Sequence, residues 1–223
     1  MTRTLIIGGN RGIGLALAAE HLRRGHHVIV TCRQRTAELD ALGVEVVEGV
    51  EVTDSNSLQR AEQSVSPGNI DRLIVNAGVL ETERFDALDE HAFANIEKQF
   101  NVNAIGPLRA VHAFQARLQP GSRVGILTSR MGSMADNGSG GYYGYRMSKA
   151  AVNAAGKSLA NDLRPRGVAV ALLHPGFVRT GMTGGQGDVD PAQAAAGLSD
   201  RLDALSLESS GRFWHANGSE LPW

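Results

Sequence analysis

Thr4-Leu5-Ile6-Ile7-Gly8-Gly9-Asn10-Arg11-Gly12-Ile13-Gly14 is the stretch that decides how this chain folds. A short apolar strand runs directly into a turn with glycines at positions 8, 12 and 14, and a helix rich in alanine and leucine follows from Leu15. A strand, a glycine turn and a helix in this order form a cradle for phosphate, because the first N–H groups of the helix have no partners within it.

Each glycine of this turn has an expected role. Gly8 lets the chain turn, Gly12 lets a pyrophosphate approach the backbone, and Gly14 lets the helix pack closely on the strand. The spacing is G-x-x-x-G-x-G rather than G-x-G-x-x-G. An ordinary glycine-rich turn is the alternative interpretation, but the flanking strand and helix favour nucleotide binding.

Apolar strands alternate with helices along the rest of the chain. We expect further strands at 27–32, 44–48, 71–75, 123–128, 168–173 and 211–214. Helices are expected at 54–65, 89–103, 108–118, 145–164 and 191–205, with Gly106-Pro107 interrupting the helical pattern. This order predicts a single Rossmann-like α/β domain over residues 1–223, with a doubly wound, mostly parallel sheet of about seven strands and helices on both faces.

Composition excludes several classes of function. The net charge is −1, with 22 basic and 23 acidic residues and no block of like charge, so neither nucleic acid nor an anionic membrane is indicated. The single cysteine, Cys32, excludes an internal disulfide and fits a reducing cytosol. No stretch approaches the ~18 apolar residues of a membrane span, and no secretory signal is visible. We therefore expect a cytoplasmic protein, and no spacing typical of metal ligands is present.

The end of the second expected strand indicates which dinucleotide binds. An acid near this position bonds the adenosine ribose in many such folds, but here Cys32 is followed by Arg33. Without that carboxylate nothing repels a 2′-phosphate, and Arg33 and Arg11 can both pair with one. This favours NADP(H) over NAD(H); the alternative is that both arginines are solvated surface residues.

Tyr145 and Lys149 are four residues apart, so they share one face of a helix. An ammonium beside a phenol favours the phenolate, and we expect it to lower the tyrosine pKa enough for proton transfer near neutral pH. A Tyr-x-x-x-Lys match occurs by chance in many chains. Its weight depends on the other motifs.

Other polar positions have structural as well as functional interpretations. Asn76-Ala77-Gly78 ends an expected strand where a doubly wound sheet meets its ligand, but it also fits a plain turn. Asn103 fits a helix bend or a bound water, and Ser129 ends the fifth expected strand. His174 is interpreted as a satisfied polar residue at a strand end. The glycine-rich segment 183–190 is expected to be mobile.

Together these motifs resemble the short-chain dehydrogenase/reductase family. They occur in the family's order: Gly8-x-x-x-Gly12-Ile13-Gly14, Asn76-Ala77-Gly78, Asn103, Ser129, Tyr145-x-x-x-Lys149, and Pro175-Gly176 with Thr180. Each is weak alone, but six in order are specific. Thr31-Cys32-Arg33, the stretch Asp136 to Arg146 and the closing Leu221-Pro222-Trp223 further resemble the C-factor-like and sniffer-like carbonyl reductases.

The resemblance implies roles for these residues. Tyr145 would donate a proton to a carbonyl, Lys149 would lower its pKa and bind the nicotinamide ribose, and Ser129 would bond the substrate oxygen. Asn103 would hold a water of the proton relay. The implied cofactor-binding set also contains Gly8, Asn10, Arg11, Gly12, Ile13, Gly14, Arg33, Glu51, Val52, Asn76, Ala77, Gly78, Pro175, Gly176, Val178 and Thr180.

Three departures from the family pattern stand out. Ile7 replaces the usual threonine, so a hydrogen bond bracing the glycine turn is lost. Ser129 lies further before Tyr145 than in many members, which leaves Ser133 as the alternative substrate-binding serine. Glu51 replaces the more usual aspartate and can accept the same hydrogen bond.

The sequence thus predicts NADPH-dependent reduction of an aldehyde or ketone, a small-molecule substrate. A silent NADP(H)-binding sensor, signalling or scaffold protein is the alternative, and a methyltransferase would leave the Tyr-Lys pair without a role. Helices 89–118 and 145–163 pair subunits in many family members, which leaves homodimer, homotetramer and monomer open. An apolar substrate pocket can draw on Phe177, Met182, Tyr142 and Met134, each of which also fits the core.

Overall fold

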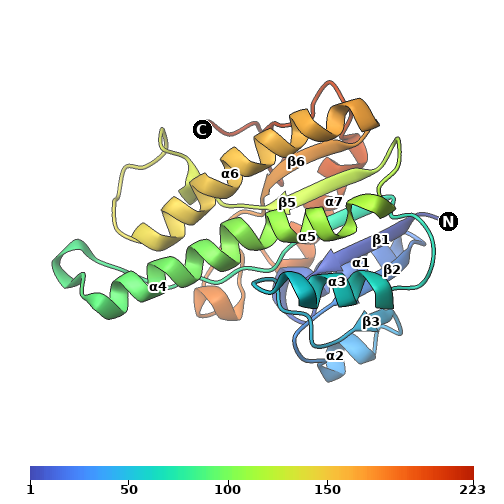
Figure 1. Ribbon diagram of the computed structural model, residues 1–223. Helices are drawn as coiled ribbons and strands as arrows, with labels where there is room; N and C mark the ends of the chain where they lie inside the picture. The colour runs from blue at the N-terminus through green and yellow to red at the C-terminus, as the bar shows by residue number, and fades with distance from the viewer.

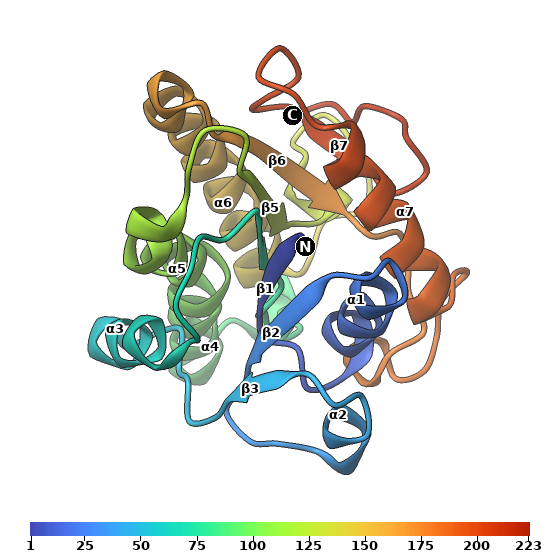
Figure 2. The same ribbon diagram turned by 90° about the vertical axis from the view of Figure 1, so that its right-hand side faces the viewer.

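The computed structural model describes residues 1–223 and contains one parallel seven-stranded sheet, in the order β3-β2-β1-β4-β5-β6-β7. Figure 2 shows the sheet with α1, α2 and α7 on one face and α3 to α6 on the other. The predicted doubly wound α/β fold is confirmed. The strands are β1 (Arg3–Ile7), β2 (His27–Thr31), β3 (Glu45–Val47), β4 (Arg72–Val75), β5 (Arg123–Leu127), β6 (Ala169–His174) and β7 (Phe213–His215).

The helices follow the expected order, with one short addition, α2, that the sequence did not predict. They are α1 (Gly12–Arg23), α2 (Ala37–Asp40), α3 (Ser55–Ser64), α4 (Glu90–Phe100), α5 (Gly106–Phe114), α6 (Tyr143–Leu163) and α7 (Pro191–Ala204). Short polar side chains start several of them: Asp54 accepts from the N–H of Asn56, and Asp89 accepts from the N–H of Ala92, both at 2.8 Å. None of the helices is long and apolar enough to cross a membrane.

The expected interruption at Gly106-Pro107 is wrong. A π-helical turn, Asn101–Ile105, joins α4 to α5, so the chain stays helical from residue 90 to 114. Pro107 lies in the first turn of α5, where a missing N–H is tolerated. A Cβ on Gly106 would lie 3.1 Å from the Val52 side chain, so this glycine allows close packing rather than a break.

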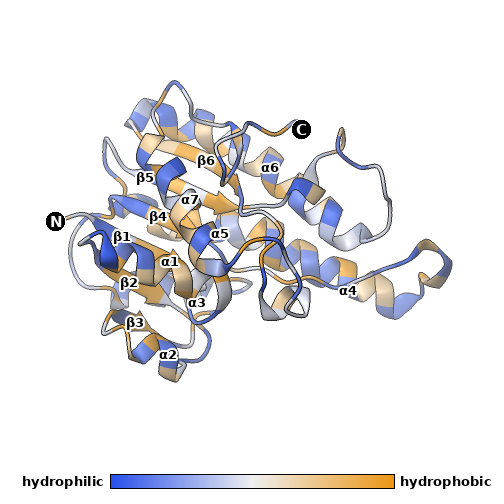
Figure 3. Cartoon of the chain, turned by 180° about the vertical axis from the view of Figure 1, so that it is seen from behind, coloured by the Kyte–Doolittle hydropathy of each residue, from blue (hydrophilic) through white to orange (hydrophobic).

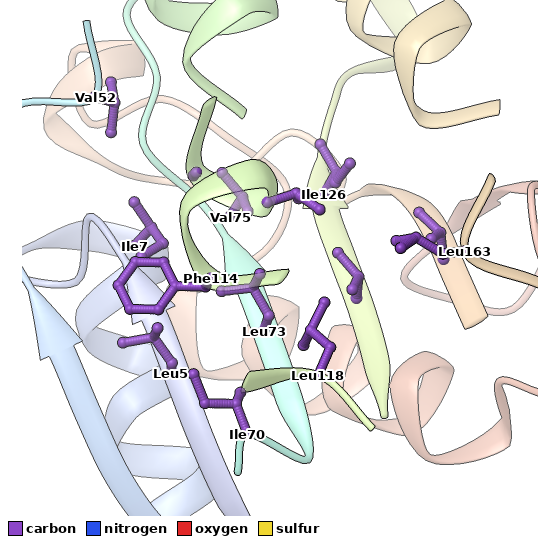
Figure 4. Packing of buried hydrophobic residues seen from close by; sticks show 14 of the residues in the cluster. Leu5, Ile7, Val52, Ile70, Leu73, Val75, Phe114, Leu118, Ile126 and Leu163 are labelled. Atoms are coloured by element: carbon purple, nitrogen blue, oxygen red, sulfur yellow. The ribbon is translucent and has the colours of Figure 1, made fainter. Parts of the chain in front are cut away.

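A separate cluster of buried apolar side chains lies on each face of the sheet. Phe114 of α5 is fully buried and packs beside Leu5, Ile7 and Leu73 of the central strands (Figure 4). On the other face, Leu17 of α1 and Leu198 of α7 cover the strands. Strands buried on both faces are expected to be apolar, and Figure 3 shows them mainly in the hydrophobic colour, while the helices carry alternating hydrophilic and hydrophobic residues. This sheet fixes the carboxyl ends of β1, β4, β5 and β6 along one edge.

Candidate active site

The glycine turn after β1 has the conformation that its glycines predict. Gly8 and Gly12 have φ angles of 86° and 54°, which favour glycine. A Cβ on Gly14 would run into the carbonyl oxygen of Gly8 and would lie 2.6 Å from Nδ2 of Asn76. The start of α1 is therefore held tightly inside the turn, and its first N–H groups have no partner within the helix.

Ile7 cannot make a side-chain hydrogen bond to the glycine turn, but Asn76 makes one. Its Nδ2 donates a hydrogen bond of 2.5 Å to the carbonyl oxygen of Gly8, across from the end of β4. The N–H groups of Asn76 and Ala77 both donate to the carbonyl oxygen of Ile7. The strand end expected to line the adenosine side thus also fixes the shape of the glycine turn.

A cleft of about 570 Å³ runs along the carboxyl edge of the sheet. It brings together most of the residues expected to bind the cofactor: Asn10, Arg11, Gly12, Ile13, Arg33, Glu51, Val52, Asn76, Ala77, Gly78, Tyr145, Lys149, Pro175 and Thr180. Lys98 and Asn101 also line it, although no sequence pattern singled them out, and so does Met182, which was named for an apolar substrate pocket. Thr180 lies across the cleft from Gly12, since a Cβ there would be 3.5 Å from the Thr180 methyl group.

Four residues that were expected to bind the cofactor do not line the cleft but support the segments that do. Gly8 and Gly14 lie inside the turn, as described above. Gly176, with a φ of 94°, makes the turn after β6, and Val178 is buried and forms a β-bridge with Val189. That bridge and a bond from Asp188 N–H to the Phe177 carbonyl tie segment 183–190 back onto the chain. Its expected mobility stays a prediction.

Tyr145 and Lys149 lie on one face of α6 and are both buried. The Lys149 Nζ lies 5.6 Å from the centroid of the Tyr145 ring and donates to the carbonyl oxygen of Leu127 at 3.0 Å. Leu127 ends β5, so the lysine links the helix to the carboxyl edge of the sheet. The backbone partner of Lys149 could not be read from the sequence.

Burial dominates the titration of both groups. It raises the pKa of Tyr145 to about 12, and a hydrogen bond with Ser129 offsets part of this rise. Burial also lowers the pKa of Lys149 to about 8. The expected lowering of the Tyr145 pKa is therefore wrong for the polypeptide itself, because the loss of solvation on burial raises it.

The two candidate serines occupy different surroundings. Ser129 is 7% exposed, acts through its side chain to lower the pKa of Tyr145, and accepts from the N–H of Met131 at 3.1 Å. The hydroxyl of Ser133 instead accepts from the N–H of Asp136, also at 3.1 Å, and so closes a turn of the following loop. The geometry favours Ser129 as the serine beside the tyrosine.

Asn103 lies in the π-helical turn and is completely buried. Its side chain accepts from the N–H of Val79 and donates to the carbonyl of Val79, both at 2.8 Å. It also donates to the Ser148 hydroxyl at 3.1 Å, which in turn donates to the carbonyl oxygen of Tyr145. Sequence reasoning missed Ser148, although its spacing of three from Tyr145 places both on one helix face.

Arg11 and Arg33 both line the cleft at the end away from Tyr145. With Asn10 and Gln34 they also line a second hollow of about 440 Å³. Both guanidinium groups are exposed, and neither forms an ion pair within the chain. Asn10 donates to the carbonyl oxygen of Gln34 at 3.0 Å, which joins the glycine turn to the loop after β2. Two free cations thus face the place where an adenosine 2′-phosphate is expected.

His174, expected to be a satisfied polar residue, ends β6 and meets His215 of β7 edge to face, with ring centroids 4.9 Å apart. Its buried Nδ1 has no hydrogen-bond partner, so the expectation of a satisfied side chain is wrong. Burial lowers the pKa of His174 to about 3, which keeps it neutral near pH 7.

The fold and this cleft define a nucleotide-dependent oxidoreductase of the Rossmann type. The sequence profile of the short chain dehydrogenase family matches residues 2–190, and the chain belongs to that family.

Two relatives cover much of the chain. It is 40% identical to the 1-hydroxy-2-glutathionyl-2-methyl-3-butene dehydrogenase of Rhodococcus sp. (strain AD45), with all of both chains covered. It is 44% identical to the C-signal of Myxococcus xanthus over 72% of this chain and 96% of that one. These relatives support the expected C-factor-like relationship.

Solved carbonyl reductases have the same fold. The Sniffer carbonyl reductase of D. melanogaster has a TM-score of 0.91 at 26% identity, with both chains fully covered. A carbonyl reductase from Pseudomonas aeruginosa PAO1, solved in complex with NADP, has a TM-score of 0.87 at 32% identity, again over both whole chains. The expected sniffer-like relationship is confirmed, and these similarities support carbonyl reduction as the general activity.

Proposed function

We propose that this protein reduces an aldehyde or ketone to an alcohol with NADPH, and that Tyr145 donates the proton. The observation that carries the proposal is the arrangement of one cleft. Tyr145, Lys149 and Thr128 line one part of it, and two unpaired arginines, Arg11 and Arg33, line another. A dinucleotide with a 2′-phosphate needs both kinds of surroundings.

The residues present fit such a cofactor. The glycine turn leaves its backbone bare where a pyrophosphate would approach, and the start of α1 presents N–H groups there. Arg11 and Arg33 would hold the 2′-phosphate, Glu51 and Val52 the adenine side, and Lys149 the nicotinamide ribose. When bound, the nicotinamide supplies the hydride that reduces the carbonyl carbon.

The chain's own side chains handle the oxygen and the proton. Ser129 would donate a hydrogen bond to the carbonyl oxygen and so stabilise the negative charge that develops there. The raised pKa of Tyr145, about 12, keeps its phenol protonated near pH 7, which is the form that reduction needs. Asn103 would hold a water, and the proton that Tyr145 gives up would be replaced through this water.

Reduction and oxidation are the two directions of one reaction, and the relatives differ in the direction that their names record. The Rhodococcus relative is named a dehydrogenase, whereas the similar solved structures are named carbonyl reductases. Oxidation requires the tyrosine as phenolate, which burial disfavours in this chain. The protonated phenol is the form from which a reduction starts, and the concentrations of cofactor and substrate set the net direction.

Consumption of NADPH with a panel of aldehydes and ketones tests the proposal, with NADH run in parallel. Tyr145→Phe removes the proton donor and should lower kcat by about 10²- to 10⁴-fold while cofactor affinity persists. Tyr143→Phe is the matched control, since the second tyrosine lies on the same helix. Turnover by Tyr145→Phe at the wild-type rate would overturn the assignment.

A signalling role is the second candidate, favoured by the similarity to the C-signal of Myxococcus xanthus. A signal protein on this fold would bind NADP(H) without needing turnover. The same assay separates the two candidates: tight NADPH binding with no turnover on any compound would favour the signalling role.

A further inference from the structure

Glu83 is a buried carboxylate with no ion pair. It is 4% exposed, and no arginine, lysine or histidine lies within salt-bridge distance of it. Instead, one oxygen accepts from Nε2 of Gln99 at 2.5 Å and the other accepts from the N–H of Gly144 at 3.1 Å. A carboxylate is rarely buried unless its partners hold it in place, so this contact calls for an explanation.

The partner Gly144 lies in the first turn of α6, which has no cap of its own. Tyr142, the residue before the helix, is left-handed with a φ of 53° and gives no side-chain hydrogen bond. The first N–H groups of a helix need an acceptor from elsewhere. Glu83 provides it from a distant segment and also accepts the N–H of Tyr142 at its backbone oxygen, at 2.9 Å. A carboxylate at this end is favoured by the helix dipole.

Gln99 and Gly144 fit closely around this contact. Gln99 is completely buried, and its Oε1 accepts from the N–H of Glu81 at 3.0 Å. A Cβ on Gly144 would meet Nε2 of Gln99 and would lie 2.9 Å from the Cα of Ile96. Helices α4 and α6 therefore pack closely where the cap forms, and Figure 1 shows them running side by side.

Tyr145 directly follows Gly144, so whatever fixes the first turn of α6 also fixes the proton donor. We propose that Glu83 is a positioning residue: it caps α6 from outside the helix and holds Tyr145 at its place in the cleft. The effect on turnover rests on the proposed function of Tyr145, whereas the cap itself does not.

The direction of the hydrogen bonds makes the proposal testable. Glu83 accepts twice, and Gln99 accepts once and donates once. In Glu83→Gln one donor is left facing another donor in either orientation of the new amide. In Gln99→Glu two carboxylates face each other in a buried place. The double variant Glu83→Gln/Gln99→Glu exchanges the two groups and restores an acceptor for every donor.

The experiment compares these three variants with the wild type and with Asp86→Asn, an exposed carboxylate in the same segment. We expect Glu83→Gln to lower kcat by about 10- to 100-fold, because small misplacements of a reacting group have effects of that size. NADPH affinity should change by less than about twofold, because the glycine turn and the two arginines, Arg11 and Arg33, are untouched. The double variant should recover most of kcat, and Asp86→Asn should equal the wild type.

Amide hydrogen exchange over residues 143–147 provides a second readout that needs no substrate. Glu83→Gln should speed exchange there by at least about tenfold, and the double variant should restore it. If the wild type shows no turnover, the proposed function fails while exchange still tests the cap. Wild-type kcat and exchange in Glu83→Gln would overturn the proposal, as would a double variant that is no better than the single variants or does not fold.

Discussion

The Nζ of Lys149 lies 5.6 Å from the centroid of the Tyr145 ring, while its hydrogen bond reaches the carbonyl oxygen of Leu127 at 3.0 Å. The ammonium is thus anchored to the end of β5 rather than to the phenol oxygen. Its positive charge still lies near the reacting group, so the charge on Lys149 should govern the reaction as the pH changes.

The first prediction concerns this pH dependence. The pKa of Lys149 is lowered to about 8, so its ammonium is present below pH 8 and lost above it. We expect kcat/KM for reduction in the free enzyme to fall as the pH rises through that value. Lys149→Arg keeps the charge at all accessible pH values, so its lower activity should show no such fall. A fall near the same pH in Lys149→Arg would contradict this assignment.

The second prediction separates the two serines. Ser129→Ala removes the hydroxyl beside Tyr145 and should lower kcat by about 10²- to 10³-fold, as for loss of one oxyanion donor. Ser133→Ala removes only the turn contact with Asp136 and should cost about 1 kcal/mol of unfolding free energy with little change in kcat. Steady-state kinetics and urea denaturation measure both effects, and the reverse pattern would make Ser133 the substrate-binding serine.

The third prediction concerns cofactor choice. Arg33→Ala removes one of two cations at the far end of the cleft and should raise KM for NADPH by about 10- to 100-fold. KM for NADH should hardly change, because NADH has no 2′-phosphate. Arg35→Ala is the control, since that guanidinium pairs with Asp40 at 2.7 Å. Equal effects of Arg33→Ala on both cofactors would remove the basis for NADPH preference.

The fourth prediction concerns acid stability. His21 is completely buried between His26 and Ser199, and burial, assisted by the charges of His26 and Arg72, lowers its pKa to about 3. In the unfolded chain His21 binds a proton below about pH 6.5, whereas in the folded chain it stays neutral down to about pH 3. The free energy of unfolding therefore decreases as the pH falls below 6.5.

Between about pH 6 and pH 4, His21 alone should contribute a slope of about 1.4 kcal/mol per pH unit to the unfolding free energy. Urea denaturation at several pH values measures it. His21→Gln should remove this part of the slope, whereas His91→Gln, on the exposed surface of α4, should leave it unchanged. An identical slope in His21→Gln would show that other groups cause the acid sensitivity.

The fold was predictable because its signals are local. Apolar runs such as Val168 to Leu173 and the glycine turn after β1 each fix one strand or one turn, and their order along the chain fixes a parallel sheet. The order of the family motifs then predicted that Tyr145, Lys149 and the glycine turn share one site. The short helix α2 and the π-helical turn were missed, because neither has a distinct periodicity in so few residues.

What the sequence could not show depends on contacts between distant segments. The direction of the Tyr145 pKa was misjudged because burial, which a sequence does not reveal, raises it. The brace from Asn76 to Gly8 and the cap from Glu83 to Gly144 join residues 68 and 61 positions apart. No spacing rule covers such pairs, so only the folded chain reveals them.

The π-helical turn at Asn101–Ile105 changes which side of the continuous helical segment 90–114 faces the sheet. One extra residue turns everything after it by about 100° around the helix axis. The half before the turn packs on α6, and the half after it packs on α3. An unbroken α-helix of the same length would show one continuous stripe to one neighbour. Deleting Asn101, which is not a core residue, should therefore rotate the apolar stripe of α5 away from the sheet, although every side chain of the core would still be present.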